Sequence, residues 1–441
     1  MSRVFPAYTY GQGPREHCYW PATATPPHFP AAEGAITCDV AVIGAGFTGL
    51  SAALHLAEAG SDVVVLEAQD LGWGASGRNG GFCCLGGSAA SDSMLAKLYG
   101  EPARRDFRTA EHRAVDLTAG LIERFAIGCD THSRGETLLA HTRKAMNAFD
   151  AKARLIERDY GVTATITPQQ DLAAKGMNGP FFGAITTPIG FALNPLKYVI
   201  GLAGAAGQAG VRIFTGSPVQ RIDRQGAYTL TTPRATVTAK RLIVATNGYS
   251  SDDLPGWLRG RYLPTQSNVI VTRPLTEAEL AAQGWTTHQM AYDDRFLLHY
   301  FRLMPNRQML FGMRGGLFSS AAADARMYQV VRQQFEDMFP AWARVETPYS
   351  WQGLLSISRD LTPFAGPIPG MPGAFAALSY HGNGVAMGTY AGALLADLVQ
   401  DRVPRNLYPK IMQTPPRRFP LGRFRRAALW PVYAMAMVTG G

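Results

Sequence analysis

Short apolar runs alternate with stretches of helical periodicity along most of the chain. An apolar run at 40–43 predicts a buried parallel strand, followed by a helix over 47–59 and a second strand over 61–67. Charged and apolar residues alternate at helical spacing from about 101 to 134, which predicts an amphipathic helix, and another helix is expected over 143–160. Strands that alternate with helices in this way are typical of an α/β fold.

The second half of the chain begins with the same alternation and then changes to strands. Asn194 is a predicted N-cap, and Pro195 starts a helix that runs to Ala209, where Gly210 stops it. Residues 261–350 are predicted to be mostly alternating strands. Further short strands are expected at 137–140, 163–166, 211–214, 235–238, 241–248 and 374–379, with a last helix ending near 400.

These elements predict an α/β (α+β) chain of two domains, and its 441 residues suit that number. A Rossmann-like domain is expected to be discontinuous, and an antiparallel-sheet substrate domain is inserted into it. The predicted segments are 36–134, 192–260 and 351–405 for the first domain and 135–191 and 261–350 for the second. Residues 1–35 are expected to form an arm over the body, and 406–441 a basic and apolar C-terminal segment.

Composition excludes several classes of protein. Hydrophobic residues make up 46% of the chain, too many for a disordered protein, and no apolar run is long enough to span a membrane. The first 20 residues have no apolar signal core, and the five cysteines suit a reducing compartment, so a cytoplasmic protein is expected. No pair of cysteines or histidines has ligand spacing, so no metal site is expected.

The formal net charge of +9 is concentrated towards the C-terminus. Arginines crowd residues 417–426 without an acid among them, and an apolar, aromatic stretch follows at 427–435. Such a segment can lie on a membrane surface, which for a cytoplasmic protein is the inner face of the membrane. The alternative is that it packs on its own protein with its arginines in solvent. Because the excess charge is local, nucleic acid is not an expected partner.

The turn at 44–49 carries the most specific chemical signal. Gly44 allows a tight strand-to-helix turn, Gly46 lets a pyrophosphate approach the backbone, and Gly49 lets helix and strand pack closely. The helix that follows directs its positive end at the phosphates. Glu67, at the end of the next strand, is placed to accept hydrogen bonds from ribose hydroxyls. Together these features predict that the chain binds a dinucleotide.

A second glycine-rich segment directly follows the Glu67 strand. Residues 71–81 read Leu-Gly-Trp-Gly-Ala-Ser-Gly-Arg-Asn-Gly-Gly, and so many small residues leave backbone amides free to approach a planar ligand. With this loop, the chain resembles the D-amino-acid oxidase and glycine oxidase superfamily of FAD-dependent amine oxidoreductases. Its stretch at 74–81 is most similar to the γ-glutamylputrescine oxidoreductase branch. Other segments that carry the resemblance are 244–248, 300–303, 310–312, 351–353 and 381–385.

The resemblance implies FAD as the cofactor. Some relatives bond the flavin covalently through a histidine in this loop, but the corresponding position here is Arg78, so non-covalent FAD is expected. A thiol link through Cys83 or Cys84 is the alternative. The implied FAD contacts are Gly44, Gly46, Phe47, Thr48, Gly49, Glu67, Ala75, Ser76, Arg78, Asn79, Gly80, Val219 (on a strand), Thr246, Gly382, Asn383, Gly384 and Val385. In the last of these segments, helix N-terminal amides would stabilise negative charge on the reduced flavin.

The implied reaction removes a hydride from the carbon beside a substrate nitrogen, and the imine then hydrolyses. The electron acceptor is O2 or a quinone or other electron carrier. Tyr300 and Arg302 share one face of a strand that the resemblance places over the flavin. Arg302 is the predicted clamp for a substrate carboxylate, with Arg314 as a weaker candidate. Trp351 is predicted to wall the pocket and His381 to form a hydrogen bond near the flavin.

The substrate stays open among several amines. A γ-glutamylated amine such as γ-glutamylputrescine, which belongs to polyamine catabolism, is the first choice, and D-amino acids or N-methyl amino acids are the alternative. An NAD-dependent dehydrogenase shares the first motif but does not explain 71–81 or 381–388. The remaining hypothesis is a non-enzymatic FAD-binding protein that contacts a membrane through 417–441.

Overall fold

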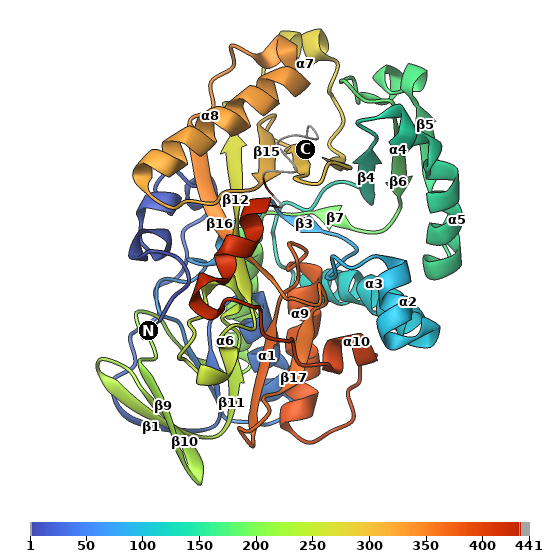
Figure 1. Cartoon of the computed structure of the whole chain (residues 1–441). Coiled ribbons are helices and arrows are strands. Elements are labelled where there is room, and N and C mark those ends of the chain that lie inside the picture. The colour runs from blue at the N-terminus through green and yellow to red at the C-terminus, as the bar shows by residue number, and fades with distance from the viewer. Residues whose placement is uncertain (1, 432, 434–441) are drawn as a thin grey trace.

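Two eight-stranded sheets dominate the computed structural model, which describes residues 2–431 and 433 (Figure 1). The first sheet has the strand order β17-β18-β11-β1-β2-β8, and β10 and β9 continue it beside β11. Parallel pairing of β1 with β2 and β11 is typical of a dinucleotide-binding sheet. Its strands are β1 Gly34–Ile43, β2 Val63–Leu66, β8 Arg212–Phe214, β9 Arg221–Gln225, β10 Ala227–Thr231, β11 Ala235–Val244, β17 Phe364–Pro367 and β18 Ala374–Leu378.

Helices pack on one face of this sheet and bury its apolar side chains. The helix α1 (Phe47–Glu58) contacts both α6 (Pro195–Gln208) and α9 (Ala386–Val399), and α9 also contacts α3 (Glu101–Arg124). A Cβ on Gly392 of α9 would lie only 2.4 Å from a backbone oxygen of α1, so a glycine is required for this approach. The smaller helices α2 Asp92–Tyr99 and α10 Lys410–Gln413 lie near α3.

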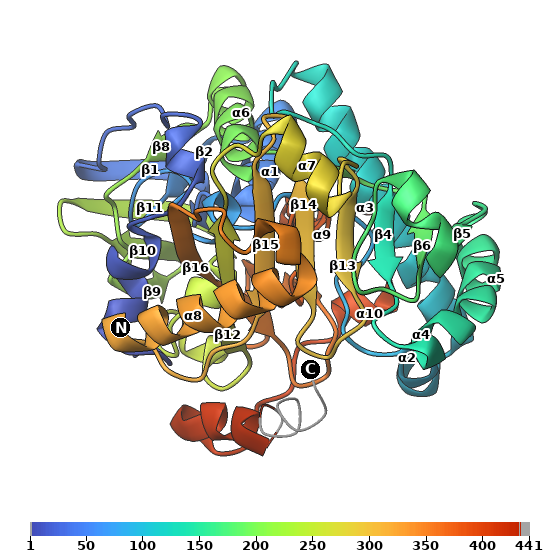
Figure 2. The same ribbon diagram turned by 90° about the horizontal axis from the view of Figure 1, so that it is seen from above.

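The second sheet has the order β16-β12-β15-β14-β13-β4-β6-β5 and is seen from above in Figure 2. All of its pairs are antiparallel except β13 with β4. Its strands are β4 Glu136–Leu139, β5 Thr165–Pro168, β6 Gly183–Thr187, β12 Leu263–Val271, β13 Met290–Asp293, β14 His299–Leu303, β15 Met309–Arg314 and β16 Tyr349–Ile357. The short strands β3 Phe82–Cys83 and β7 Phe191–Ala192 pair separately.

The sequence pattern missed the helix α8 (Ala321–Met338), because residues 261–350 were expected to be mostly strands. Ser320 caps it by accepting a hydrogen bond from the amide of Ala323 at 3.1 Å. Its buried residues are only Val331, Phe335 and Met338, too narrow an apolar stripe for the periodicity to stand out. These residues pack with α7 (Glu277–Gln283) on one face of the second sheet.

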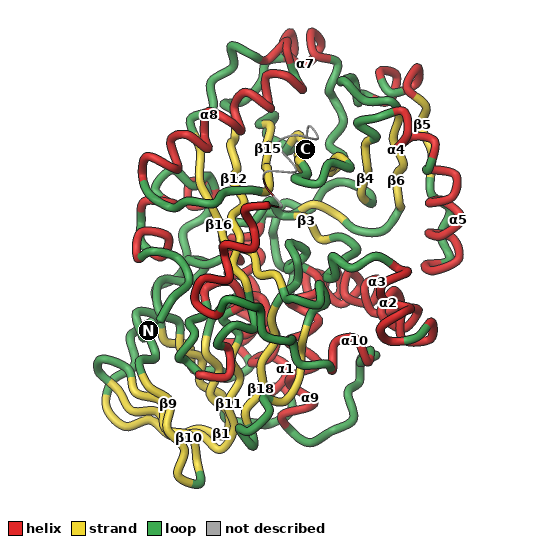
Figure 3. Tube along the Cα trace, in the orientation of Figure 1, coloured by secondary structure: helices red, strands yellow, loops and turns green. Residues whose placement is uncertain are grey.

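Several predicted elements differ in extent from the observed ones. The helix expected over 143–160 is two helices, α4 (Arg143–Asn147) and α5 (Phe149–Tyr160), and α5 lies beside β5 and β6 (Figure 3). The two strands expected between 235 and 248 are the single strand β11, because β1 pairs with its whole length. Val219 lies in the loop between β8 and β9 and not on a strand.

The predicted domain division remains a prediction, although the boundary predicted between residues 350 and 351 falls within a strand. Residue 351 falls inside β16, which pairs with β12 of the second sheet from end to end. In the N-terminal arm, Phe5, Tyr10 and Trp20 are buried, and residues 7–22 contain short 3-10 turns. Trp20 is buried there and donates from its indole to the Asn79 carbonyl at 2.9 Å. Within the described residues, no helix is both long enough and apolar enough to cross a membrane.

Candidate active site

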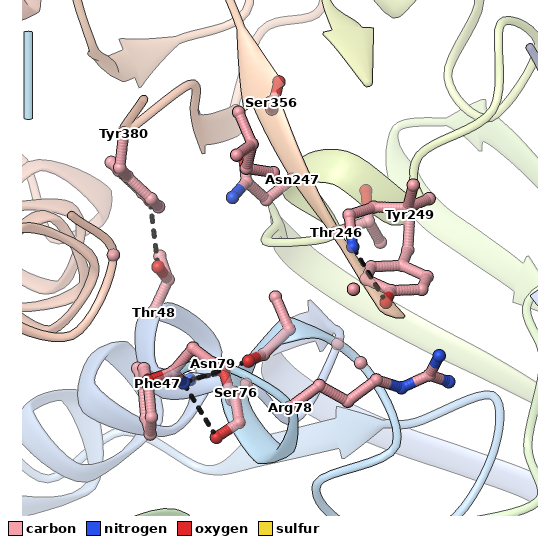
Figure 4. Close-up of a pocket in the computed structure, with 18 of the residues that line it drawn as sticks. Phe47, Thr48, Ser76, Arg78, Asn79, Thr246, Asn247, Tyr249, Ser356 and Tyr380 are labelled. Carbon is pink, nitrogen blue, oxygen red and sulfur yellow. Dashed lines mark hydrogen bonds between the residues drawn. The ribbon is translucent and has the colours of Figure 1, made fainter. Parts of the chain in front are cut away.

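A cavity of about 370 Å³ is lined by residues from both large sheets. Figure 4 shows part of its wall, where the start of α1 meets the loop at 76–79 and residues 246–249. The lining runs from the ends of β1 and β2 to side chains of β13, β14 and β15 in the second sheet. The cavity therefore connects the predicted nucleotide-binding turn with the predicted substrate region.

The turn between β1 and α1 has the geometry that its glycines predicted. Gly44 has a φ of +104°, a backbone conformation that favours glycine. A Cβ on Gly46 would lie 2.8 Å from the Ser76 hydroxyl, and that hydroxyl accepts a hydrogen bond from the Phe47 amide at 3.0 Å (Figure 4). Gly49 does not line the cavity, and a Cβ there would lie 1.9 Å from the Gly44 carbonyl oxygen, so this glycine serves the close packing of the turn. This turn fits a pyrophosphate that approaches the amides at the start of α1.

Glu67 lies at the end of β2 and lines the cavity. Its carboxylate accepts hydrogen bonds from the amides of Ala45 at 2.9 Å and Gln69 at 3.1 Å. Burial raises the pKa of this carboxyl group, while the backbone amides act in the opposite direction. The two amides fix its position beside the glycine turn, where a ribose would follow the pyrophosphate.

The glycine-rich loop at 71–81 is held in place mainly through its arginine. Arg78 is 2% exposed and donates to the carbonyl oxygens of Trp73 at 2.6 Å and Gln352 at 3.3 Å. Its guanidinium also lies 5.4 Å from the Trp73 ring and 5.6 Å from the Tyr249 ring. Trp351 donates from its indole to the Arg78 carbonyl at 2.7 Å and does not line the cavity. The prediction that Trp351 forms part of the pocket wall is therefore wrong. Its indole N–H instead holds the glycine-rich loop on the side away from the cavity lining.

Most residues predicted to contact the cofactor do line the cavity. They come from six separate segments of the chain, which the fold brings to one cavity. The lining includes Gly44, Gly46, Phe47, Thr48, Glu67, Ala75, Ser76, Arg78, Asn79, Gly80, Val219, Thr246, Gly382, Asn383, Gly384 and Val385.

The structure does not support Arg302 as a carboxylate clamp. Arg302 is 1% exposed and lies outside the cavity lining. Its guanidinium donates to the carbonyl oxygens of Gly80 at 3.0 Å and Leu193 at 2.7 Å, and to the His132 imidazole at 2.8 Å. Burial and the neighbouring Arg302 lower the pKa of His132 to about 4, so its ring is a neutral acceptor. Arg302 thus connects β14 with the glycine-rich loop.

His381 is also placed outside the cavity lining. Its ring lies 2.9 Å from the Gly87 carbonyl oxygen and accepts from the Ser358 amide at 3.3 Å, and burial lowers its pKa to about 4. It is a structural side chain in the turn before α9. In the same turn, the backbone amide of Asn383 donates to the Tyr380 carbonyl at 3.0 Å. The amides of Gly384 and Val385 remain the candidates to face a flavin.

One face of the second sheet brings polar side chains to the far end of the cavity. Tyr300 pairs with Gly312 on β15, and Arg314 is two residues further on, so Tyr300 and Arg314 share that face. A Cβ on Gly312 would lie 2.1 Å from the Tyr300 ring, so the glycine leaves room for the phenol. Tyr292 of β13 pairs with Tyr300 and lies on the same face. All three of these side chains line the cavity.

Arg314 has no acidic partner within the part of the chain that the structure describes. Its guanidinium donates to the His381 carbonyl at 3.1 Å, and burial lowers its pKa. A half-buried guanidinium without a carboxylate partner is poised to bind an anionic ligand. The weaker of the two arginine candidates is therefore the one at the cavity.

Sequence reasoning missed Glu136 and Tyr292, which also line the cavity. Glu136 is the first residue of β4 and pairs with Met290 on β13. Because Met290 and Tyr292 are two residues apart on one strand, Glu136 lies on the same face of the sheet as Tyr292. The only signal in the sequence was a lone acid in front of the apolar run 137–140. That signal cannot be told from the solvated end of an ordinary strand.

The basic C-terminal segment packs on the protein over its described length. Arg425 is fully buried and donates to both carboxylate oxygens of Asp252, at 2.7 and 2.8 Å. Arg417 pairs with Asp360, and the Arg426 guanidinium lies over the Phe5 ring at 3.6 Å. The expectation of solvated arginines is therefore wrong for Arg425 and, in part, for Arg426, whereas the Arg417 side chain remains 61% exposed. Residues 432 and 434–441 of the predicted membrane segment lie outside the described residues.

Comparisons with known proteins agree with this geometry. A family model described as "DAO: FAD dependent oxidoreductase" matches residues 39–398. The chain is 32% identical to the gamma-glutamylputrescine oxidoreductase of Escherichia coli over 391 residues, covering 89% of this chain and 90% of that protein. It is 31% identical to the probable oxidoreductase OrdL of Haemophilus influenzae over 82% of each chain. The glycine oxidase structure from Geobacillus kaustophilus superposes with a TM-score of 0.70 at 20% identity, covering 86% of this chain and 99% of that one.

Proposed function

The chain belongs to the DAO family of FAD-dependent oxidoreductases, and from that membership we propose that it oxidises a γ-glutamylated amine such as γ-glutamylputrescine. That it is an FAD-dependent enzyme acting on amines or amino acids follows from the family itself. The hypotheses of an NAD-dependent dehydrogenase and of a non-enzymatic protein are therefore set aside.

The residues at the cavity fit FAD. The α1 turn and its amides would hold the pyrophosphate, Glu67 the adenosine ribose, and the loop at 75–80 with Gly384 and Val385 the isoalloxazine. When bound, FAD supplies the acceptor for the hydride removed from the carbon beside the substrate nitrogen. The chain itself must hold the substrate against that ring and keep water out. Non-covalent binding remains a prediction.

The observation that carries the choice of substrate is the unpaired guanidinium of Arg314. It lies on the sheet face that closes the cavity, between Tyr300 of β14 and the turn at 381–382. A γ-glutamyl group brings a carboxylate that matches the planar fork of an arginine. The similarity to a γ-glutamylputrescine oxidoreductase supports the same class of substrate. D-amino acids and N-methyl amino acids also carry a carboxylate and are the alternative.

An anaerobic flavin-bleaching screen tests this proposal. Purified holoenzyme would be mixed with γ-glutamylated amines, polyamines, D-amino acids and N-methyl amino acids, and the loss of the yellow absorbance followed. We expect γ-glutamylated amines to bleach the flavin fastest. Rapid bleaching by D-amino or N-methyl amino acids alone would contradict the proposed γ-glutamylated substrate and support that alternative. Admitting air to the bleached enzyme then distinguishes O2 from another electron carrier as the acceptor.

Replacing Glu67 with glutamine tests the predicted ribose contact. A hydrogen bond to a charged group contributes about 1.5–3 kcal/mol, so the variant should bind FAD about tenfold more weakly or worse. The measurement is a titration of the apoprotein with FAD, followed by flavin fluorescence. Glu58→Gln, at an exposed ion pair with Arg124, is the matched control and should bind FAD like the wild type. Equal FAD affinity of the Glu67 variant would remove this carboxylate from the cofactor site.

We propose a cytoplasmic protein, in keeping with the absence of a spanning helix among the described residues. Phe424 and Trp430 remain 63% and 53% exposed on the C-terminal segment, which supports peripheral membrane contact as the alternative. Co-sedimentation of the full chain with anionic vesicles tests this contact, and a protein that stays in the supernatant would exclude it.

A further inference from the structure

Glu136 is an exception among the buried carboxyl groups of this protein. In the described part of the chain, the buried carboxyl side chains are Glu111, Glu136, Asp252, Asp293, Asp360 and Asp397. All of these except Glu136 have an arginine at ion-pair distance. Buried carboxylates are costly unless they are paired, so a carboxyl group without an ion-pair partner at a cavity is a candidate to bind a cationic ligand.

The position of Glu136 shows where that cation would come from. Its side chain is 7% exposed and lines the cavity together with Cys84, Tyr292 and Arg314. It lies on the same sheet face as Tyr300 and Arg314, but Glu136 and Arg314 do not form an ion pair with each other. The far end of the cavity thus carries one unmatched carboxyl group and one unmatched guanidinium. A ligand with both an ammonium and a carboxylate group would satisfy both.

We propose that Glu136 is the specificity-determining residue that binds the ammonium group of the substrate, while Arg314 binds its carboxylate. This inference rests on the proposed function, because it takes the substrate to be an amine with a separate carboxylate. Glu136 would select cationic amines over neutral isosteres of the same length. A plain carboxylic acid or a plain alkylamine would match only one of these two charges.

The titration of Glu136 supports this role. Burial raises its pKa to about 7, so this carboxyl group is poised between its neutral and charged forms at neutral pH. Above pH 7 the charged carboxylate can form an ion pair with an ammonium group. Below pH 7 the group is mostly the neutral acid, which cannot form that ion pair. The groups whose hydrogen bonds or charges reach Glu136 are the Cys84 thiol, the phenols of Tyr160 and Tyr292, Lys152 and Glu111.

The test compares two unreactive probes with the oxidised holoenzyme. One is an ω-amino carboxylate whose amino group is on a carbon that bears no hydrogen, so it cannot be oxidised. The other is the same molecule with a hydroxyl in place of the amino group. Dissociation constants are measured from the perturbation of the flavin absorbance. We expect the wild type to bind the amine at least tenfold more tightly than the alcohol, and Glu136→Gln to bring this ratio close to one without changing the affinity for the alcohol.

Two comparisons make the result specific. Arg314→Met should weaken both probes by the same factor and leave their ratio unchanged. For the wild type, the ratio should rise as the pH increases through about 7, because the carboxylate then forms, and for Glu136→Gln it should stay flat. A wild-type ratio near one, or a ratio that survives in Glu136→Gln, would overturn the role of Glu136.

This experiment is separable from the test of the proposed function. If the bleaching screen selects D-amino or N-methyl amino acids instead, the γ-glutamyl assignment fails. The same pair of variants would then be tested with the amine class that bleaches the flavin. Selectivity for its cationic form that is lost in Glu136→Gln would support the role of Glu136, and selectivity that persists would overturn it.

The stability of Glu136→Gln provides a readout that does not depend on ligands. In the folded protein this carboxyl group holds its proton up to about pH 7, whereas an ordinary glutamate loses it near 4.5. The folded state therefore binds more protons in this window, and the wild type loses stability as the pH rises through it. We expect the two proteins to melt alike at pH 5 and the variant to melt at a higher temperature at pH 8. A variant that is less stable at pH 8 would show that Glu136 has a structural partner.

Discussion

Replacing Arg314 with methionine is expected to lower kcat/KM for a γ-glutamylated amine by about 100-fold or more. Removing one member of a buried, hydrogen-bonded charge pair costs about 2–5 kcal/mol, and each 1.4 kcal/mol corresponds to a factor of ten. The guanidinium has no acidic partner among the described residues, so the substrate carboxylate would supply that charge pair. Methionine keeps the length and apolar contacts of the side chain and removes only the charge and the donors. The measurement is the rate of anaerobic flavin reduction against substrate concentration.

Two controls separate carboxylate binding from a general defect. Arg314→Lys keeps the positive charge but loses the planar pair of donors, so its kcat/KM should lie between those of the wild type and the methionine variant. An alkylamine without a carboxylate should react with the wild type and Arg314→Met at similar rates. If both variants lose activity equally with both kinds of amine, Arg314 serves the flavin or the fold and not the carboxylate.

Replacing Arg425 with alanine is expected to destabilise the protein by about 3–5 kcal/mol. Arg425 is fully buried, and its two hydrogen bonds to Asp252 are supplemented by one to the Tyr262 carbonyl at 2.7 Å. Without the arginine, Asp252 is left as an uncompensated buried charge, which is the costly way to break such a pair. The measurement is the free energy of unfolding of the holoenzyme in urea. Hydrogen exchange of residues 417–431 would show whether this segment detaches first.

Arg423→Ala is the matched control, because Arg423 lies in the same segment but is exposed. Its substitution should change the free energy of unfolding by less than about 0.5 kcal/mol. The double variant Asp252→Ala with Arg425→Ala should be less destabilised than the sum of the single variants, since it leaves no unpaired charge. Equal stability of the Arg425 and Arg423 variants would contradict the account of this segment as anchored by a buried ion pair.

The turn predicted to bind the cofactor forms as expected because its signals are local. Gly44, Gly46 and Glu67 all lie in one strand–turn–helix–strand unit of about 25 residues, and the predicted role of each depends only on the backbone of that unit. The predicted strand at 40–43 is part of β1, and the predicted helix over 47–59 is α1. Such an arrangement needs only short-range geometry, so the order of residue types is enough to specify it.

The substrate end was predicted less well because it depends on register across a sheet. Arg302 and Arg314 both lie on the cavity-side face of their strands. The sequence does not show which of the two guanidinium groups is held by several hydrogen bonds within the protein and which is available to a ligand. Two backbone carbonyl oxygens and His132 take up Arg302, and they come from segments 109 to 222 residues away in the chain. Trp351 and His381 were misplaced for the same reason, since their partners also lie far away in the sequence.

The sequence by itself determined that the chain folds around a dinucleotide turn, and its motifs identified the flavin-dependent family. These features follow from local backbone requirements and helical or strand periodicity, which are written in consecutive residues. Only the tertiary structure decided which charged side chains are left unpaired at the cavity. Pairing of a buried charge depends on long-range contacts, such as those that satisfy Arg302 and Arg425 and leave Glu136 and Arg314 at the cavity without an ion-pair partner.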